Sequence, residues 1–209
     1  MADRQILFSA PMIRALLDGR KTQTRRVVGK RGGRSRPNIF DGTWADSYVL
    51  DPGNVSWRED STPWKAGDRL QVREACAIDG NRVFYRARHE EASARGPRVD
   101  VRWRPSIHMP RWASRLTLIV TDVRVQRLQD ISETDAIAEG LQPHEAPNGH
   151  VTYEVPGAVL GQTPERGFQA LWSLINGDDA WAENPWVAAI SFDVVKANID
   201  SLPAEREAV

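Results

Sequence analysis

The eight residues 19–26, Gly-Arg-Lys-Thr-Gln-Thr-Arg-Arg, are the feature that most restricts how this chain can fold. They follow a short amphipathic stretch, and their alternation predicts a strand with polar side chains on both faces. Such a strand is a poor core element, because a sheet normally buries at least one apolar face. We therefore expect it to lie at a sheet edge or along a polar cavity, and we take it as the first candidate for a site.

The composition indicates a globular protein without a membrane segment. The chain has 209 residues, of which 41% are apolar, and this suffices for one large domain or two small ones. Its apolar runs are too short to cross a bilayer or to form a secretory signal, so we expect a cytoplasmic protein with no membrane partner. The single cysteine, Cys76, excludes an intrachain disulfide and is expected to be a buried, inert thiol.

The charges are balanced overall but unevenly distributed along the chain. Up to Arg127 there are 25 Lys and Arg against 14 Asp and Glu, and from Leu128 onward there are 3 against 14. The first part therefore has a net charge of +11 and the last part −11. This pattern fits a basic surface for a phosphate-bearing partner, and it fits equally two parts that neutralise each other in the fold.

The order of elements predicts an α+β fold that is mainly β. We expect strands at residues 5–8, 19–26, 70–76, 83–85, 116–128 and 186–195. Three helices are expected between residues 9 and 19, 132 and 140, and 163 and 177, each with a polar N-cap and a glycine stop. Because most strands are adjacent in sequence, we predict a small, mostly antiparallel β-barrel with about three helices packed on it.

The predicted domain is a single one over residues 1–196, followed by a polar C-terminal tail over 197–209. Three segments interrupt the regular pattern with prolines, glycines or runs of arginine, and they read as insertions. These insertions are residues 29–66, 88–114 and 142–163.

Two short motifs resemble a known family. Gly-Arg-Lys-Thr-x-Thr-x-Arg from Gly19 and Gly-Asp-x-Leu-x-Val from Gly67 resemble the ASCH domain of the PUA-like superfamily. Within that group the chain is most similar to the small bacterial N4-acetylcytidine amidohydrolases. The resemblance covers residues 5–28, 67–76, 115–141 and 186–195, which is about half of the chain, and the three insertions have no counterpart in the minimal enzymes.

The resemblance implies a catalytic trio and no cofactor. It assigns Lys21 as general base, Thr24 as nucleophile and Glu139 as proton donor in the hydrolysis of an acylated exocyclic amine. Threonine at position 24 favours the hydrolase branch, since many ASCH domains have glutamate there. The departures are Gln23 and Arg25, where the small enzymes have apolar residues.

The chemistry makes two demands on this segment. A lysine acts as a base near neutral pH only if burial or neighbouring positive charge lowers its pKa, and Lys21 is flanked by several arginines. Lys21 and Thr24 are three residues apart, so the chain must bend after Gly19 for both to reach one cavity. An ion pair between Lys21 and Glu139 that only closes the sheet onto a helix remains the structural alternative.

Further candidates for binding the substrate come from elsewhere in the chain. Arg26 ends the family motif and suits a carboxylate or phosphate, or it forms a structural bridge to an acid such as Asp68. The proline-bracketed loop with His108, Arg111 and Trp112 could stack on a base and contact a phosphate, or Trp112 could belong to the core. The last candidate is Glu74, which either lines the cavity or pairs with an arginine.

These observations leave three functions in competition. The first is hydrolysis of a modified nucleobase or nucleoside. The second is non-catalytic recognition of RNA or modified DNA through the same cavity, and the third, less favoured, is an ASCH-type nuclease. We predict no metal site, because the four histidines lack ligand spacing with one another or with Cys76. The expected partner is thus a modified nucleoside or a nucleic acid.

Overall fold

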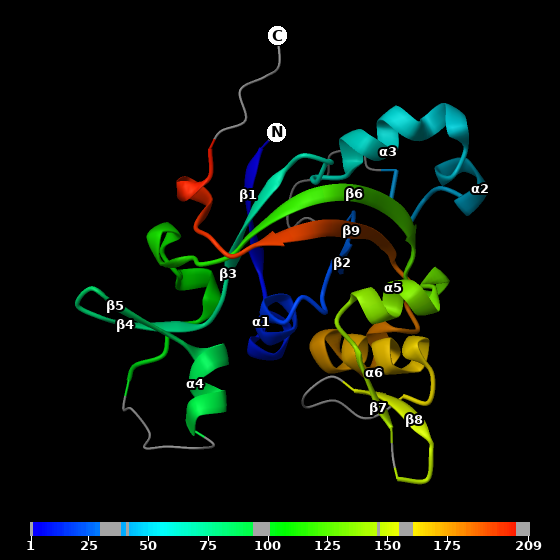
Figure 1. Ribbon diagram of the computed structural model, residues 1–209. Coiled ribbons are helices and arrows are strands. Elements are labelled where there is room, and N and C mark those ends of the chain that lie inside the picture. Colours follow the sequence, from blue (N-terminus) through cyan, green and yellow to red (C-terminus); the bar gives the residue numbers. More distant parts are fainter. Residues whose placement is uncertain are drawn as a thin grey trace. The chain divides into compact units, whose positions relative to one another are not determined.

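The computed structural model describes residues 2–29, 39–40, 42–93, 101–145, 147–154 and 161–203 (Figure 1). The chain divides into two compact units. Unit 1 comprises Met1–Gly19, Gly67–Ile119 and Asp193–Val209, and unit 2 comprises Arg20–Ala66 and Val120–Phe192. The single domain expected over residues 1–196 stays a prediction. Within the described residues, every helix is too short or too polar to cross a lipid bilayer.

The fold is α+β, as predicted, and its largest element is a five-stranded sheet. The strand order is β1-β3-β6-β9-β2, with bounds Asp3–Leu7, Arg69–Arg73, Thr117–Arg127, Trp186–Val195 and Gln23–Val27. β1 pairs with β3 in parallel, while β3 with β6 and β2 with β9 are antiparallel. Among the described strands β1 and β2 are the two edges, so the sheet is open and the expected closed barrel is wrong. The error arose because these strands are successive in sequence but are not neighbours in the sheet.

Unit 1 holds β1, β3 and the first residues of β6, together with helices α1 and α4, Ala10–Leu17 and Arg86–Ser93. α1 begins after Ser9 as predicted, buries Met12, Ile13 and Leu16, and is followed by Gly19 with φ +75°. Unit 1 also contains a hairpin in which β4, Cys76–Asp79, pairs antiparallel with β5, Arg82–Tyr85.

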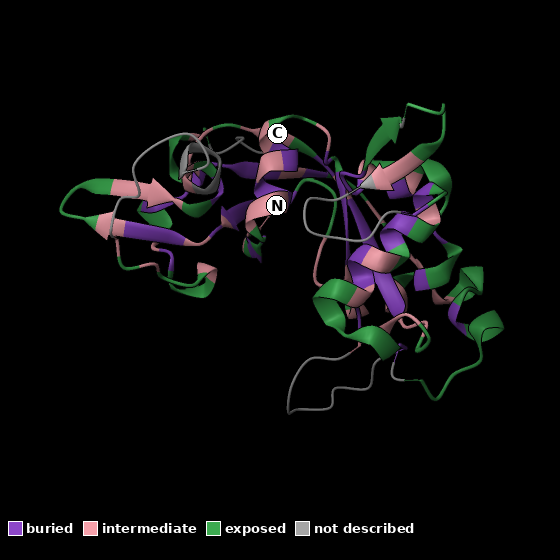
Figure 2. Ribbon diagram, turned by 90° about the horizontal axis from the view of Figure 1, so that it is seen from below, coloured by how far each residue is buried: buried purple, intermediate pink, exposed green. Residues whose placement is uncertain are grey.

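Unit 2 holds β2 and most of β6 and β9, covered by short helices. In Figure 1 α2 and α3, Asp46–Val49 and Val55–Ser61, lie on one side of β6, and α5 and α6, Glu133–Ala138 and Pro164–Asn176, lie on the other. α6 buries Phe168, Leu171 and Trp172, whereas Ile175 near its end is exposed. Figure 2 shows buried residues concentrated along the strands and on the inner sides of helices.

The insertions contain more regular structure than predicted, so the described chain has six α-helices rather than three. α2 and α3 lie within residues 29–66, and a hairpin of β7, Gln142–Glu145, and β8, Val151–Glu154, lies within residues 142–163. Aromatic packing supports α2 and α3: Trp44 stacks on Tyr48 with ring centroids 4.7 Å apart, and it meets Trp57 edge-on at 5.4 Å. These helices are too short and polar to show a helical pattern in the sequence.

The predicted tail begins as packed structure. Ile199 is fully buried, and the amide of Asn198 donates to the backbone carbonyls of Arg111 and Ser114. Residues 204–209 of the predicted tail lie outside the described residues.

Candidate functional site

The polar strand predicted from residues 19–26 is joined directly to helix α5 in unit 2. Lys21 forms an isolated antiparallel bridge with Glu139, the C-cap residue of α5. The Thr22 amide donates to the Ala138 carbonyl at 2.9 Å, and the Phe192 amide of β9 donates to the Thr22 carbonyl at 3.0 Å. The backbone therefore fixes the start of β2 between α5 and β9.

The predicted base and the predicted proton donor meet in this bridge. Lys21 Nζ donates to Glu139 Oε2 at 2.7 Å and to the Glu139 backbone carbonyl at 2.8 Å. Lys21 is 1% exposed and Glu139 is 3% exposed. An ion pair this well shielded is strongly coupled, because little water screens its charges.

Arg25 is a second buried cation on the same carboxylate. Its Nη1 donates to Glu139 Oε1 at 3.2 Å and to Gln23 Oε1 at 2.6 Å, while its Nη2 donates to Asp135 Oδ2 at 2.8 Å. Its guanidinium also lies over the ring of Phe168, 5.6 Å from the centroid. The Glu139 carboxylate is thus held between two positive charges, one on each oxygen.

Asp135 carries the network from the buried pair to the surface. It accepts a hydrogen bond from Gln23 at 3.1 Å and two from Arg124 of β6, at 3.0 and 3.1 Å. The Arg124 side chain is 49% exposed. We call the set Lys21, Gln23, Arg25, Arg124, Asp135 and Glu139 the charge network.

Four members of this network were not predicted as site residues: Arg25, Asp135, Gln23 and Arg124. Two sequence signals could have found the first two. Residues 21, 23 and 25 share one face of an extended strand, and residues 135 and 139 share one face of a helix because they are four apart. A run of alternate polar residues opposite two acids at helical spacing is a pattern for an ion network.

The pKa of Lys21 is lowered, as the sequence predicted for a lysine that acts as a base. Burial lowers the pKa of Lys21, the positive charges of Arg26 and Arg25 lower it further, and the attraction of Glu139 opposes both effects. Burial also lowers the pKa of Arg26, against the attraction of Glu139. For Asp135 burial acts to raise the pKa, but hydrogen bonds from Arg124 and Gln23 and the charge of Arg25 outweigh it, so the pKa is lowered.

Thr24, the predicted nucleophile, is 2% exposed and lies inside β2, paired with Ile190 of β9. In a regular strand its side chain projects from the face opposite to Gln23 and Arg25. The described contacts include no hydrogen bond from its hydroxyl. Arg26 shares the face of Thr24 and donates to the Arg25 carbonyl at 3.2 Å.

Glu74 belongs to unit 1 and takes the second of its two expected roles. Both of its carboxylate oxygens accept hydrogen bonds from Arg115, at 2.8 and 3.1 Å. Burial raises the pKa of Glu74, and Arg115 opposes the rise. Asp68, the suggested partner of Arg26, accepts a hydrogen bond from Arg4 at 2.9 Å within the same unit.

The loop with His108, Arg111 and Trp112 also belongs to unit 1. His108 is exposed and Trp112 is 57% exposed, so the alternative that Trp112 is a core residue is wrong. Arg111 donates to Asp200 at 2.9 Å and to Asp3 at 2.7 Å, so two carboxylates already neutralise its charge. The buried residue of this loop is instead Met109.

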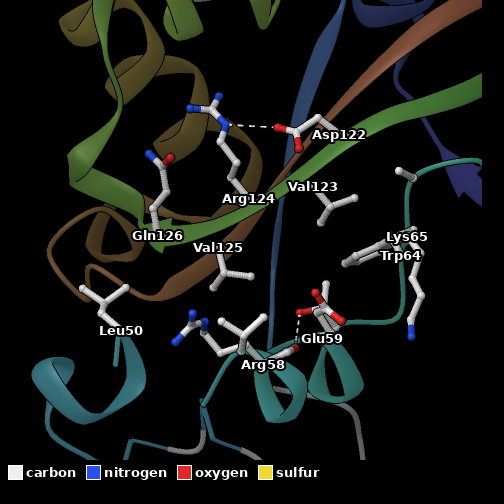
Figure 3. Close-up of a pocket in the computed structure, with 13 residues that line it drawn as sticks. Leu50, Arg58, Glu59, Trp64, Lys65, Asp122, Val123, Arg124, Val125 and Gln126 are labelled. Carbon is white, nitrogen blue, oxygen red and sulfur yellow. Dashed lines mark hydrogen bonds and ion pairs between the residues drawn. The ribbon is translucent and has the colours of Figure 1, made fainter. Parts of the chain in front are cut away.

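Unit 2 also contains a cavity of about 740 Å³ between β6 and α3 (Figure 3). Figure 3 shows Val123 and Val125 pointing into it from β6, with Trp64 across from them, while Arg124 points to the other side of the strand. Its size suits a small organic molecule, with apolar walls and charged groups at its rim. Arg124 is nevertheless among the residues that line the cavity, so this part of β6 borders both the cavity and the charge network.

Within the described part of the chain, no group of three or more His, Cys, Asp or Glu side chains is placed to hold a metal ion. No protein-family model matches the chain, and the searches of curated proteins and of solved structures also returned no match.

Proposed function

We propose that this chain is a hydrolase that removes an acyl group from the exocyclic amine of a modified nucleobase or nucleoside, with N4-acetylcytidine as the model substrate. The observation that carries the proposal is the buried contact in which the Lys21 ammonium meets the Glu139 carboxylate at 2.7 Å. The resemblance to ASCH-domain amidohydrolases gives these residues the roles of general base and proton donor, with Thr24 as the nucleophile.

The Lys21–Glu139 pair can supply both proton transfers that amide hydrolysis needs. A proton shared between Nζ and Oε2 can reside on either atom, so the ion pair and the neutral pair contain the same number of protons. Burial acts against the positive charge of Lys21, and the neutral pair is the form that the proposed reaction starts from. In the neutral form Lys21 is an uncharged amine that accepts a proton, and Glu139 is a carboxylic acid that donates one.

The acylation step follows from these protonation states. The Thr24 hydroxyl oxygen attacks the acyl carbonyl carbon while its proton passes to Lys21 Nζ. The carbon–nitrogen bond then breaks, and the leaving nitrogen takes the proton of Glu139. The products are an acyl ester on Thr24, the amine of the nucleobase, and the Lys21–Glu139 ion pair.

Hydrolysis of the ester restores the enzyme. Water attacks the ester carbonyl and gives one proton to the Glu139 carboxylate. The Thr24 oxygen leaves and takes a proton from the Lys21 ammonium, so that a carboxylic acid is released and the neutral pair returns. The same two residues thus exchange their roles between the two halves of the reaction.

The test is to incubate the purified protein with N4-acetylcytidine and related N4-acylated cytidines and to measure the cytidine released. We expect turnover by the wild type and a loss of about 100-fold or more in Lys21→Met and in Glu139→Gln. The matched controls are Lys65→Ala and Glu133→Ala, which remove an exposed lysine and an exposed glutamate of the same unit. Both controls should retain wild-type activity.

The assay also separates the hydrolase from its main competitor. A wild type that releases no cytidine but binds RNA or DNA, with an affinity that falls as salt rises, would be a non-catalytic nucleic-acid-binding module. In that case the Lys21–Glu139 pair would be a structural link between β2 and α5.

A further inference from the structure

We propose that Arg25 is a positioning residue that holds the Glu139 carboxylate from the side opposite to Lys21 and thereby lets the Lys21 ammonium release its proton inside the buried site. The consequence for catalysis rests on the proposed hydrolase activity, whereas the effect of Arg25 on the protonation of Lys21 does not.

The geometry gives each oxygen of Glu139 its own cation. Oε2 accepts from Lys21 at 2.7 Å, and Oε1 accepts from Arg25 at 3.2 Å. The Arg25 side chain is fully buried and the Glu139 side chain is 4% exposed, so solvent screens neither contact. The carboxylate therefore keeps a charged partner when Lys21 loses its proton to solvent and Glu139 stays ionised, a state with one proton fewer than the neutral pair of the catalytic cycle.

This second partner changes what happens when Lys21 loses its proton. Without Arg25, deprotonation of Lys21 would leave the buried Glu139 carboxylate without either of the two cations that donate hydrogen bonds to it in the described contacts, and the protein would resist that state. Arg25 stays protonated at any working pH, so it removes this obstacle. Its positive charge also repels the Lys21 ammonium directly, and both effects favour the neutral amine.

Among the other charged groups near Lys21, Arg26 acts in the same direction as Arg25. It repels the Lys21 ammonium and is attracted to Glu139, whereas Arg25 also donates a hydrogen bond to the Glu139 carboxylate. Asp135 of α5 binds Arg25 at 2.8 Å and fixes the guanidinium in place. Arg124 of β6 binds Asp135 and not Glu139 in the described contacts, so it is one link further from the pair.

Asp135 and Gln23 also orient the Arg25 guanidinium. Nη2 is held by Asp135 while Nη1 is shared between Gln23 at 2.6 Å and Glu139 at 3.2 Å. A planar guanidinium that two hydrogen bonds already orient can bind a third acceptor with little further loss of rotamer entropy. A lysine at position 25 would keep the charge but could not make all three contacts.

The decisive measurement is the titration of Lys21 itself, observed by NMR in protein with labelled lysine side chains. The chain has four lysines, so the spectrum is simple, and Lys21→Met identifies the signal. We expect Arg25→Met to raise the midpoint of the Lys21 titration by about one pH unit or more, because it removes a nearby like charge and the second partner of Glu139. Arg25→Lys should stay near the wild-type midpoint, since it keeps the charge.

The matched control is Arg124→Met, which removes an arginine from the same network without touching Glu139. It should shift the Lys21 midpoint by less than Arg25→Met does. If Arg25→Met leaves the midpoint unchanged in a folded protein, or if Arg124→Met shifts it as much, the proposal is overturned. Should Arg25→Met fail to fold, the double variant Arg25→Met with Asp135→Asn also removes the partly buried carboxylate that Arg25 neutralised, and the same midpoint decides.

The hydrolysis assay then tests the catalytic consequence separately. In Arg25→Met the limb of the pH–rate profile that reports Lys21 should move to higher pH by the shift seen in the titration. If the Lys21 titration shifts but the wild type shows no turnover, the effect of Arg25 on Lys21 is supported and the proposed hydrolase activity is refuted. If Arg25→Met shifts the Lys21 titration but leaves the pH–rate profile unchanged, the role of Arg25 in catalysis is refuted.

Discussion

The charge network predicts that its two buried partners are not equivalent for stability. Glu139→Leu leaves the Lys21 ammonium without its carboxylate at a site where this residue is 1% exposed. Breaking a buried ion pair by removing one partner typically reduces the free energy of unfolding by about 3–5 kcal/mol. Lys21→Met leaves Glu139 in contact with Arg25 at 3.2 Å, so the remaining charge stays paired. The loss should then be that of one charged hydrogen bond, about 1.5–3 kcal/mol.

The assay is urea unfolding at neutral pH, followed by tryptophan fluorescence and by circular dichroism. Coincident transitions from the two probes would license a two-state analysis of each variant. The expected order of stability is wild type, then Lys21→Met, then Glu139→Leu. The double variant should be less destabilised than the sum of the two single changes, because it leaves no charge of the pair behind.

Equal losses in the two single variants, or a larger loss in Lys21→Met, would refute the reasoning. Either result would mean that Arg25 does not stabilise Glu139 in the absence of Lys21. Arg124→Met serves as the control, since its guanidinium is about half exposed and its loss should change stability by less than about 1 kcal/mol.

Four further predictions concern the pH dependence of stability, the buried thiol, a crowded glycine and a helix cap. The pKa of Lys21 in the folded state lies below its ordinary value of 10.5, so between these two values the unfolded chain binds more protons than the folded one. The free energy of unfolding of the wild type relative to Lys21→Met should therefore rise with pH in this range, which urea titrations at several pH values will measure. Cys76 is fully buried and burial raises the pKa of its thiol, so it should react with a thiol reagent at mildly alkaline pH only after unfolding. Gly161→Ala should lower the free energy of unfolding by about 1–3 kcal/mol in urea titrations, because the new Cβ would clash with the Gly167 amide nitrogen. Ser132→Ala should lower it by about 1 kcal/mol in the same assay, because it removes the N-cap of α5.

Elements with strong local signals could be predicted from the sequence alone. The Thr163 cap and the glycine at 177 set the bounds of α6, and the last strand was predicted with the bounds observed for β9. The order of strands in the sheet could not be predicted, because local patterns do not specify which distant strands pair. α2 and α3 were missed because aromatic stacking around Trp44 supports them, and this packing leaves no helical period in the sequence.

The site was predicted in part, and for a similar reason. The resemblance pointed to Lys21 and Glu139, and the structure pairs them across 118 positions of sequence. Arg25 was noted only as a departure from the small enzymes, although its contacts with Asp135 and Glu139 make it a centre of the network. From the sequence alone, a charged residue in a strand such as Arg25 is expected to face solvent, because its acidic partner Asp135 lies 110 positions away in the chain.

Thr24 poses the sharpest test of the proposed chemistry, because strand alternation directs its side chain away from the face of Gln23 and Arg25. Lys21 precedes β2, and its ammonium binds Glu139, the carboxylate that Arg25 also contacts, so the proposed chemistry requires the Thr24 hydroxyl to reach that ammonium from its place beside Ile190. If Thr24 is the nucleophile, rapid quenching of the wild type with N4-acetylcytidine should trap a protein heavier by one acetyl group on residue 24. Thr24→Val should then show neither the adduct nor turnover.

A Thr24→Val variant that still releases cytidine would assign a different role to the pair. In that outcome Lys21 would take its proton from water, and the attack would occur on the Glu139 side of the strand, where Arg25 also points its guanidinium. The acyl-enzyme experiment therefore decides which face of β2 holds the substrate. That choice in turn determines whether Arg25 or Arg26 lies nearer to the acyl oxygen in the transition state.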